Sequence, residues 1–158
     1  DQCLDAQFQH VQPPRRILAA ANGGAPPRTL ARQTRPQETA VGKLEQDFAA
    51  YRARMNERVL AEDNRVIKRI YSVDSLAYGE DGALPKQTKE LLGLVASLVL
   101  RCDDCVKYHL VESRNAGSSR KEIVEAMSIG LVVGGTIVIP HLRRAVEFLD
   151  DLDSGAAG

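Results

Sequence analysis

Apolar side chains recur at steps of three and four residues along most of the chain from residue 41 onward. This is the spacing of one face of an α-helix. A first stretch covers residues 44–60, and a second covers 66–76 after a break near Asn64. Apart from the short run 136–139, no segment alternates apolar and polar residues in the manner of a strand. The sequence therefore predicts an all-α fold, a bundle of helices.

Proline, glycine and capping residues divide the second half of the chain into four more helices. Pro85 suits the first turn of a helix that is apolar on most sides, so we expect this helix to be buried. The helix after it ends at Gly117, a typical C-terminal signal. Ser119 and Glu122 form a capping box that starts another helix, and the glycine pair 134–135 separates that helix from the last one.

Residues 1–40 differ in composition from the rest. They hold five of the seven prolines, and between residues 6 and 37 there are five arginines and no acidic residue. We expect a disordered or mobile arm here, a helical domain over 41–153 and a flexible tail over 154–158. An organelle transit segment is the alternative for the arm, because such segments are rich in arginine and poor in acid. The weak serine content and weak amphipathic pattern favour an ordinary arm.

Charge balance and hydropathy exclude several classes of partner. Lys and Arg number 21, as do Asp and Glu, so the formal net charge is zero. Nucleic acid or an anionic membrane as the main partner would require a clustered basic excess. The longest uncharged stretch, 127–140, is shorter than the roughly 20 apolar residues that span a bilayer. Three cysteines do not make a secreted disulfide scaffold. We expect a soluble, cytoplasmic protein.

The residues with the clearest chemical potential are Cys102 and Cys105, separated by two residues, and His109, four residues further on. On a helix these three side chains share one face. Two thiols one turn apart can close a disulfide with little backbone movement, and a helix N-terminus favours the thiolate. His109 can take the proton of Cys105. Asp103 and Asp104 oppose this activation if their side chains face the sulfurs.

Glu90 lies twelve residues before Cys102, on the preceding apolar helix. A carboxylate among apolar neighbours must be paired or hydrogen-bonded, and here it could orient His109 and complete a Glu–His–Cys relay. The order of attack stays open, because the helix N-terminus favours Cys102 whereas closeness to His109 favours Cys105. The other interpretations are passive core cysteines, or a zinc site with His141 or Glu90 as the fourth ligand.

Residues 84–152 resemble the carboxymuconolactone decarboxylase superfamily, and within it the alkylhydroperoxidase D-like (AhpD-like) branch. That branch is marked by a glutamate, a C-x-x-C motif beginning twelve residues later, and a histidine four residues after the second cysteine. In this sequence these residues are Glu90, Cys102, Cys105 and His109. The resemblance implies an all-helical AhpD-like bundle that works as a homo-oligomer, a trimer or hexamer. A small domain with such apolar helices also has more hydrophobic surface than one core hides.

By this resemblance the protein is a thiol–disulfide oxidoreductase, in which Cys102 and Cys105 shuttle between dithiol and disulfide while Glu90 and His109 relay protons. Its substrate is a hydroperoxide or a disulfide, its electron donor is a dithiol, and the site uses no metal and no organic cofactor. Asp104 stands where well-studied peroxidases of the branch have a second histidine, and no aromatic residue lies between the cysteines. Dithiol redox chemistry is therefore the first expectation and peroxidase activity the second. The alternatives are a lyase that acts on a lactone without thiol turnover, and a non-catalytic helical assembly protein.

Overall fold

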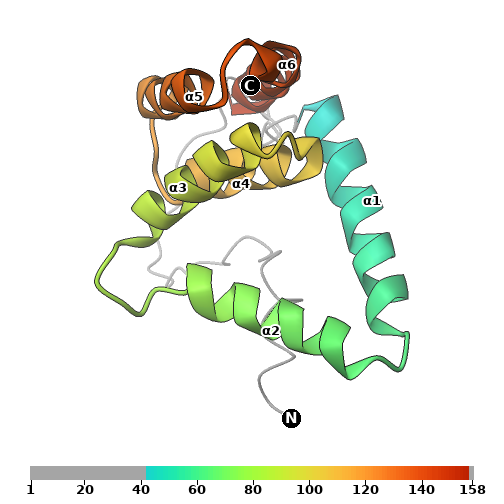
Figure 1. Ribbon diagram of the computed structural model, residues 1–158. Helices are drawn as coiled ribbons and strands as arrows, with labels where there is room; N and C mark the ends of the chain where they lie inside the picture. Colours follow the sequence, from blue (N-terminus) through green and yellow to red (C-terminus); the bar gives the residue numbers. More distant parts are fainter. Residues whose placement is uncertain (1–41, 157–158) are drawn as a thin grey trace, which may run out of the picture. The chain divides into compact units, whose positions relative to one another are not determined.

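The computed structural model describes residues 42–156, and every regular element within them is helical (Figure 1). This confirms the all-α prediction. The arm predicted over residues 1–40 lies outside the described residues, as do residues 157 and 158. The elements are α1 (Lys43–Leu60), α2 (Arg65–Tyr78), α3 (Lys86–Val99), α4 (Asp103–Asn115), α5 (Arg120–Gly134), the short 3₁₀ helix η2 (Thr136–Val138) and α6 (Ile139–Ala156).

Side-chain caps fix the starts of α2 and α5. The side chain of Asn64 accepts hydrogen bonds from the amides of Val66 and Ile67 and so caps α2. Ser119 and Glu122 form the predicted capping box at the start of α5. The last helix is longer than the sequence predicts, since α6 runs to Ala156 and includes residues 154–156 of the predicted flexible tail. The ambiguous run 136–139 is a 3₁₀ turn that leads into α6.

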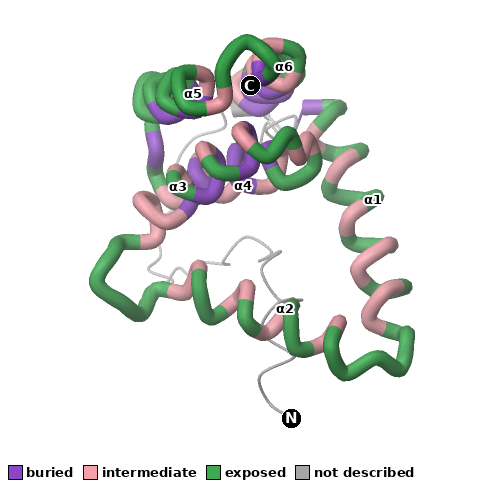
Figure 2. Tube along the Cα trace, viewed as in Figure 1, coloured by how far each residue is buried: buried purple, intermediate pink, exposed green. Residues whose placement is uncertain are grey.

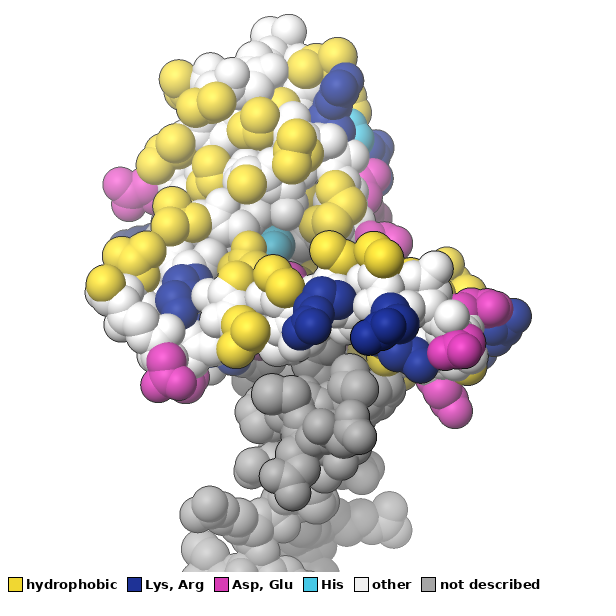
Figure 3. Space-filling model, turned by 60° about the horizontal axis from the view of Figure 1, so that its bottom comes forward, with side chains coloured by type: hydrophobic (Ala, Val, Ile, Leu, Met, Phe, Trp, Pro, Cys, Tyr) yellow, Lys and Arg dark blue, Asp and Glu magenta, His cyan; other side chains and the backbone are white. Residues whose placement is uncertain are grey.

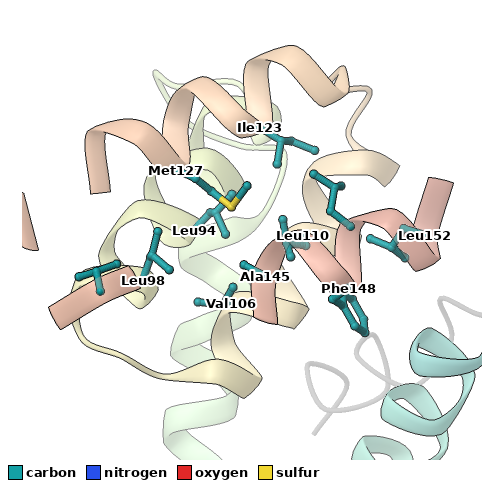
Figure 4. Packing of buried hydrophobic residues seen from close by; sticks show 11 residues of the cluster. Leu94, Leu98, Val106, Leu110, Ile123, Met127, Ala145, Phe148 and Leu152 are labelled. Atoms are coloured by element: carbon teal, nitrogen blue, oxygen red, sulfur yellow. The ribbon is translucent and has the colours of Figure 1, made fainter. Parts of the chain in front are cut away.

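The hydrophobic core lies among α3, α4, α5 and α6, with one residue from η2 (Figure 4). Full burial of each large side chain of this kind stabilises the fold by about 1.5–3 kcal/mol. No residue within α1 or α2 is buried (Figure 2). The core comprises Leu94, Leu98, Val106, Leu110, Ile123, Met127, Val138, Ala145, Phe148, Leu149 and Leu152.

The first two helices join this core at a few specific contacts. Phe48 of α1 packs edge-to-face on Phe148 with ring centroids 5.8 Å apart. The hydroxyl of Tyr71 in α2 donates a hydrogen bond of 3.0 Å to Oδ1 of Asn56 in α1. At the other end of α2, the ammonium of Lys89 donates to the carbonyls of Gly79 and Asp81, at 2.7 and 2.9 Å. These bonds attach the α2–α3 connection to the side of α3.

Several apolar side chains that the pattern would place in a core are on the surface. The expectation that α3 is buried on most sides is wrong at Leu92, which is 55% exposed. Leu100, directly after α3, is 76% exposed. The outer face of α2 is apolar as well, with exposures of 51–72% at Val66, Ile70, Val73 and Leu76.

No helix among residues 42–156 combines the length and the apolar character that crossing a membrane requires.

Candidate functional site

The turn between α3 and α4 brings Cys102 to the start of a helix. The amide of Cys102 donates to the carbonyl of Ser97, and the amide of Arg101 donates to that of Leu98, at 3.0 and 3.1 Å. This is the Schellman pattern that ends many helices. It requires that the first residue beyond the helix C-cap takes the left-handed conformation. Arg101 takes that conformation with φ 61°, a position that glycine normally occupies. The residue that completes the end of α3, Cys102, is therefore also the N-cap of α4.

Cys102 and Cys105 are joined by a disulfide, with their Cα atoms 5.3 Å apart. That separation is within the ordinary range for disulfides. Cys105 is exposed and Cys102 is partly buried, so solvent reaches the pair from the Cys105 side. Both sulfurs sit at the N-terminal end of α4, where the unpaired amides and the helix dipole favour negative charge.

A buried acid–histidine pair joins α4, the helix that carries the cysteines, to α3. Nδ1 of His109 is 2.9 Å from Oε2 of Glu90, and the two side chains are 8% and 0% exposed. An ionised carboxylate only accepts hydrogen bonds, so Nδ1 donates and Nε2 is left as the basic nitrogen of the neutral ring. The contact predicted between Glu90 and His109 is thus present in the structure. Among the described residues, Oε1 of Glu90 has no hydrogen-bond partner.

Gly93 and Tyr78 complete the surroundings of His109, and neither was among the residues predicted from the sequence. The rings of Tyr78 and His109 have centroids 5.0 Å apart. A Cβ placed on Gly93 would lie 2.6 Å from the Tyr78 hydroxyl and 2.7 Å from Nε2 of His109. The Tyr78 hydroxyl and the His109 ring therefore pack directly against the backbone of α3 at Gly93. Burial raises the pKa of Tyr78 above its ordinary value, and the charges of Glu90 and Asp74 add to the effect.

Tyr108 covers another side of the same histidine. Its ring centroid is 5.2 Å from that of His109, in an edge-on arrangement. The guanidinium of Arg52, in α1, lies 4.1 Å above the Tyr108 ring, a cation–π contact. Burial, followed by the charges of Glu112 and Glu90, raises the pKa of Tyr108 to about 12. Aromatic rings thus cover two sides of His109.

The two aspartates inside the motif have different surroundings. Asp103 accepts hydrogen bonds from Nδ1 of His141 at 2.7 Å and from Nε of Arg144 at 2.8 Å, both on α6. Burial by itself would raise the pKa of Asp103, but these hydrogen bonds and the charge of Arg144 outweigh it, so this pKa is lowered. Asp104 is exposed, and its carboxylate lies 3.6 Å from the ammonium of Lys107 on the same helix.

The histidine considered as a fourth zinc ligand, His141, is thus engaged with an aspartate. Within the described part of the chain, no three His, Cys, Asp or Glu side chains are grouped so that they could hold a metal ion. The third cysteine, Cys3, lies outside the described residues.

Comparison with known proteins places these features in a family. The model of the carboxymuconolactone decarboxylase family matches residues 68–148, half of the chain. The chain belongs to the carboxymuconolactone decarboxylase family. Its spacing of Glu90, the cysteine pair and His109 is consistent with the AhpD-like branch.

Solved structures of family members show the same fold. Two crystal structures of the Thermotoga maritima protein TM1620 are 54% and 53% identical to the matched part, with TM-scores of 0.66 and 0.64. They cover 68% of this chain, and the matched regions make up 94% and 90% of those chains. One of them is described as a family member that is a candidate participant in an antioxidative response. A family protein of Legionella pneumophila, 23% identical with a TM-score of 0.51 over 69% of this chain and 89% of that chain, shares the fold.

Two curated relatives carry no functional description. Uncharacterized protein 4 in the cox locus of Paracoccus denitrificans is 30% identical over 73 residues, which are 46% of this chain. An uncharacterized protein of Cupriavidus necator is 28% identical over 75 residues, 48% of this chain. In both cases the match spans 66% of the relative's own length.

Proposed function

We propose that this protein is a thiol–disulfide oxidoreductase that reduces hydroperoxides at Cys102 and Cys105 with electrons from a dithiol donor. The observation that carries the proposal is a cysteine pair, closed as a disulfide, on the same helix as a buried histidine that a carboxylate orients. The description of the Thermotoga maritima relative, linked to an antioxidative response, supports a peroxide as the substrate. The site residues are Cys102, Cys105, His109 and Glu90.

Exposure and position favour Cys105 as the attacking thiol. It is the more exposed cysteine, and it lies one helical turn before His109. Nε2 of His109 takes the thiol proton, the Cys105 thiolate attacks the outer oxygen of the hydroperoxide, and the O–O bond breaks. The leaving alkoxide takes the proton from His109 and departs as an alcohol, while Cys105 becomes a sulfenic acid.

The second half of the cycle closes and reopens the disulfide. The Cys102 thiolate attacks the Cys105 sulfur, the S–O bond breaks, and the hydroxyl leaves as water after protonation. A dithiol donor then attacks the disulfide, returns both cysteines to the reduced state and is itself oxidised to a disulfide. Peroxide gains the two electrons that the donor loses, so the cycle requires neither a metal nor an organic cofactor. A cytoplasmic location would keep such a donor reduced.

The exposed Cys105 also favours a second substrate class. A protein or small-molecule disulfide can accept attack by the same thiolate, form a mixed disulfide, and be released when Cys102 closes the ring. Asp104, in the place of a second histidine, removes a proton donor that a peroxidase would use but that disulfide exchange does not need.

We further propose that the protein acts as a homo-oligomer, a trimer or hexamer. The exposed apolar side chains are too numerous for a typical monomer surface. Figure 3 shows such side chains spread over one face of the molecule and interrupted by Lys and Arg side chains. The most exposed of them are Val132 (83%), Leu100 (76%), Leu76 (72%), Val66 (71%), Val133 (68%) and Ile70 (62%).

The test of the proposed chemistry compares the wild-type protein with Cys102→Ser, Cys105→Ser and the matched control Cys3→Ser. Free thiols and consumption of hydrogen peroxide or cumene hydroperoxide are measured with dithiothreitol as the donor. We expect two thiols per chain to appear and disappear reversibly in the wild type and in Cys3→Ser, and turnover to stop in the two site variants. If both site variants consume peroxide as fast as the wild type, the redox proposal is wrong and a lyase or an assembly role takes its place.

A further inference from the structure

We propose that Asp103, His141 and Arg144 are positioning residues that adjust the charge balance at the redox pair. This inference rests on the proposed function of Cys102 and Cys105. It concerns how easily the reduced pair carries negative charge, and it assigns a role to two residues of α6 that lie 38 and 41 positions from Asp103 in the sequence.

The three side chains form one hydrogen-bonded cluster at the first turn of α4, the turn that also carries the cysteines. Asp103 is the first residue of α4 and follows Cys102 directly. Its two carboxylate oxygens accept separate hydrogen bonds, Oδ1 from His141 and Oδ2 from Arg144. The carboxylate is thereby held toward α6, in a fixed orientation.

The cluster affects the cysteines through its charges. Reaction requires a thiolate, and a carboxylate one residue away disfavours that negative charge. The guanidinium of Arg144 offsets this carboxylate through a charge-assisted hydrogen bond. The positive end of the α4 dipole can then act on the sulfurs without being cancelled by the first residue of the helix.

Other charged groups near the pair do not replace this effect. Asp104 and Lys107 balance each other on the exposed side of α4, where solvent screens both. Arg101, at the end of α3, is exposed. His109 is engaged with Glu90 in the interior. From α6, His141 and Arg144 are the groups that contact the motif.

The cluster also connects two helix starts. It ties the first turn of α4, which carries both cysteines, to the first turns of α6, which belongs to the core. Arg144 is 47% exposed and Asp103 is 35% exposed, so the pair is near enough to solvent for substitutions to be tolerated. Variants of these residues therefore report on the redox pair rather than on folding.

The experiment follows the alkylation rate of the reduced full-length protein with iodoacetamide as a function of pH, for the wild type, Arg144→Gln, Asp103→Asn and the double variant. In Arg144→Gln the uncompensated carboxylate should lower the alkylation rate at neutral pH by about three- to tenfold, since an unpaired carboxylate in the same helical turn raises the pKa of a thiol by up to about one. Asp103→Asn should raise the alkylation rate at neutral pH, because the carboxylate that disfavours the thiolate is then absent. The double variant should lie close to the wild type, because the carboxylate and the guanidinium that offset each other are then both removed.

Two controls separate charge from structure. Arg143→Gln makes the same substitution one position away, at an exposed residue of α6, and should leave the profile unchanged. Arg144→Lys keeps the charge and should restore most of the wild-type rate. The inference is overturned if Arg144→Gln and Asp103→Asn both match Arg143→Gln while the wild-type disulfide still forms and reopens; the proposed function then stands. If the wild-type pair never forms a disulfide, the proposed function fails and this inference fails with it.

Discussion

The backbone of Gly93 is the surface on which the His109 ring lies. A Cβ at this position would come within 2.5 Å of Cε1 of the imidazole, closer than two carbon atoms approach without displacement. Gly93 is buried in the middle of α3, where glycine costs about 0.5–1 kcal/mol relative to alanine. The absence of a side chain is therefore a requirement of the site, which accepts an unfavourable helix residue so that His109 and Tyr78 can approach.

Replacement of Gly93 tests this requirement. In Gly93→Ala we expect the His109 ring to move away from Glu90, with a destabilisation of about 1–3 kcal/mol from overpacking and a loss of peroxide turnover of about tenfold or more because a general base must keep hydrogen-bond geometry. Gly130→Ala is the matched control: its Cβ would meet the flexible end of Leu98 at 3.1 Å, in the core and away from His109. It should cost stability without a comparable loss of turnover per folded molecule. Equal losses of turnover in both variants would contradict a specific role for Gly93.

The Glu90–His109 pair should behave as a coupled unit. Removal of His109 alone leaves a carboxylate buried without a partner, and breaking a buried pair in this way costs about 3–5 kcal/mol. We expect His109→Asn to be less stable than the double variant Glu90→Gln/His109→Asn when free energies of unfolding are measured in urea. Both should lose turnover by about 10²- to 10⁴-fold, the usual contribution of a general base. Additive free energies in this double-mutant cycle would show that the two side chains do not interact.

Local signals explain why so much of the fold was predictable. Caps such as Asn64 and Ser119 act on amides two or three residues away, so the chain near them suffices to locate a helix start. The Glu90–His109 contact could also be predicted from the sequence, because a short connection between two helices limits where their side chains can meet. The contact of His141 with Asp103 spans 38 residues and depends on how α6 packs, which no local pattern records.

Burial was the weaker prediction for a physical reason. Helical periodicity shows which face of a helix is apolar but does not distinguish a core from a surface that another subunit covers. Leu92 and Leu100 fit the buried pattern and are exposed. No sequence pattern marks Tyr78, the last residue of α2, as a neighbour of His109. Its position there depends on the absence of a side chain at Gly93.

The left-handed conformation of Arg101 predicts a stabilising substitution. The same Schellman pattern ends α4, where Gly117 has φ 90° and the amides of Gly117 and Ser118 donate to the carbonyls of Arg114 and Ser113. Arg101→Gly should raise the free energy of unfolding by about 0.5–1 kcal/mol, since glycine takes this conformation without steric cost. Gly117→Ala, whose Cβ would meet nothing within 4 Å, should lower it by about 1 kcal/mol through backbone strain alone. Urea unfolding measures both, and a destabilised Arg101→Gly would contradict the assignment.

Tyr108 predicts a loss of stability in alkaline solution. Burial and nearby acidic side chains raise its pKa from 10.0 to about 12, so the folded protein holds the phenolic proton more tightly than the unfolded chain does. The stabilisation linked to this proton is fully present below pH about 10 and is lost as the pH rises toward about 12. Tyr108→Phe should remove this component of the pH dependence of the melting temperature. A wild-type protein whose phenols all ionise near pH 10 in an ultraviolet titration would exclude the effect.

The apolar face of α2 is the surface through which we propose that copies of the chain associate. Val66, Ile70, Val73 and Leu76 recur at helical spacing on a helix that has no buried residue, so each chain exposes a stripe that an apolar surface of another copy can cover. Leu76→Glu places a charge in that stripe and should shift sedimentation velocity profiles toward the monomer. Ala77→Glu adds the same charge at the next, exposed position and should have a smaller effect, because it removes no large apolar side chain. A wild-type chain that sediments as a stable monomer at micromolar concentration would refute the proposed oligomer and leave the exposed stripe without an assigned partner.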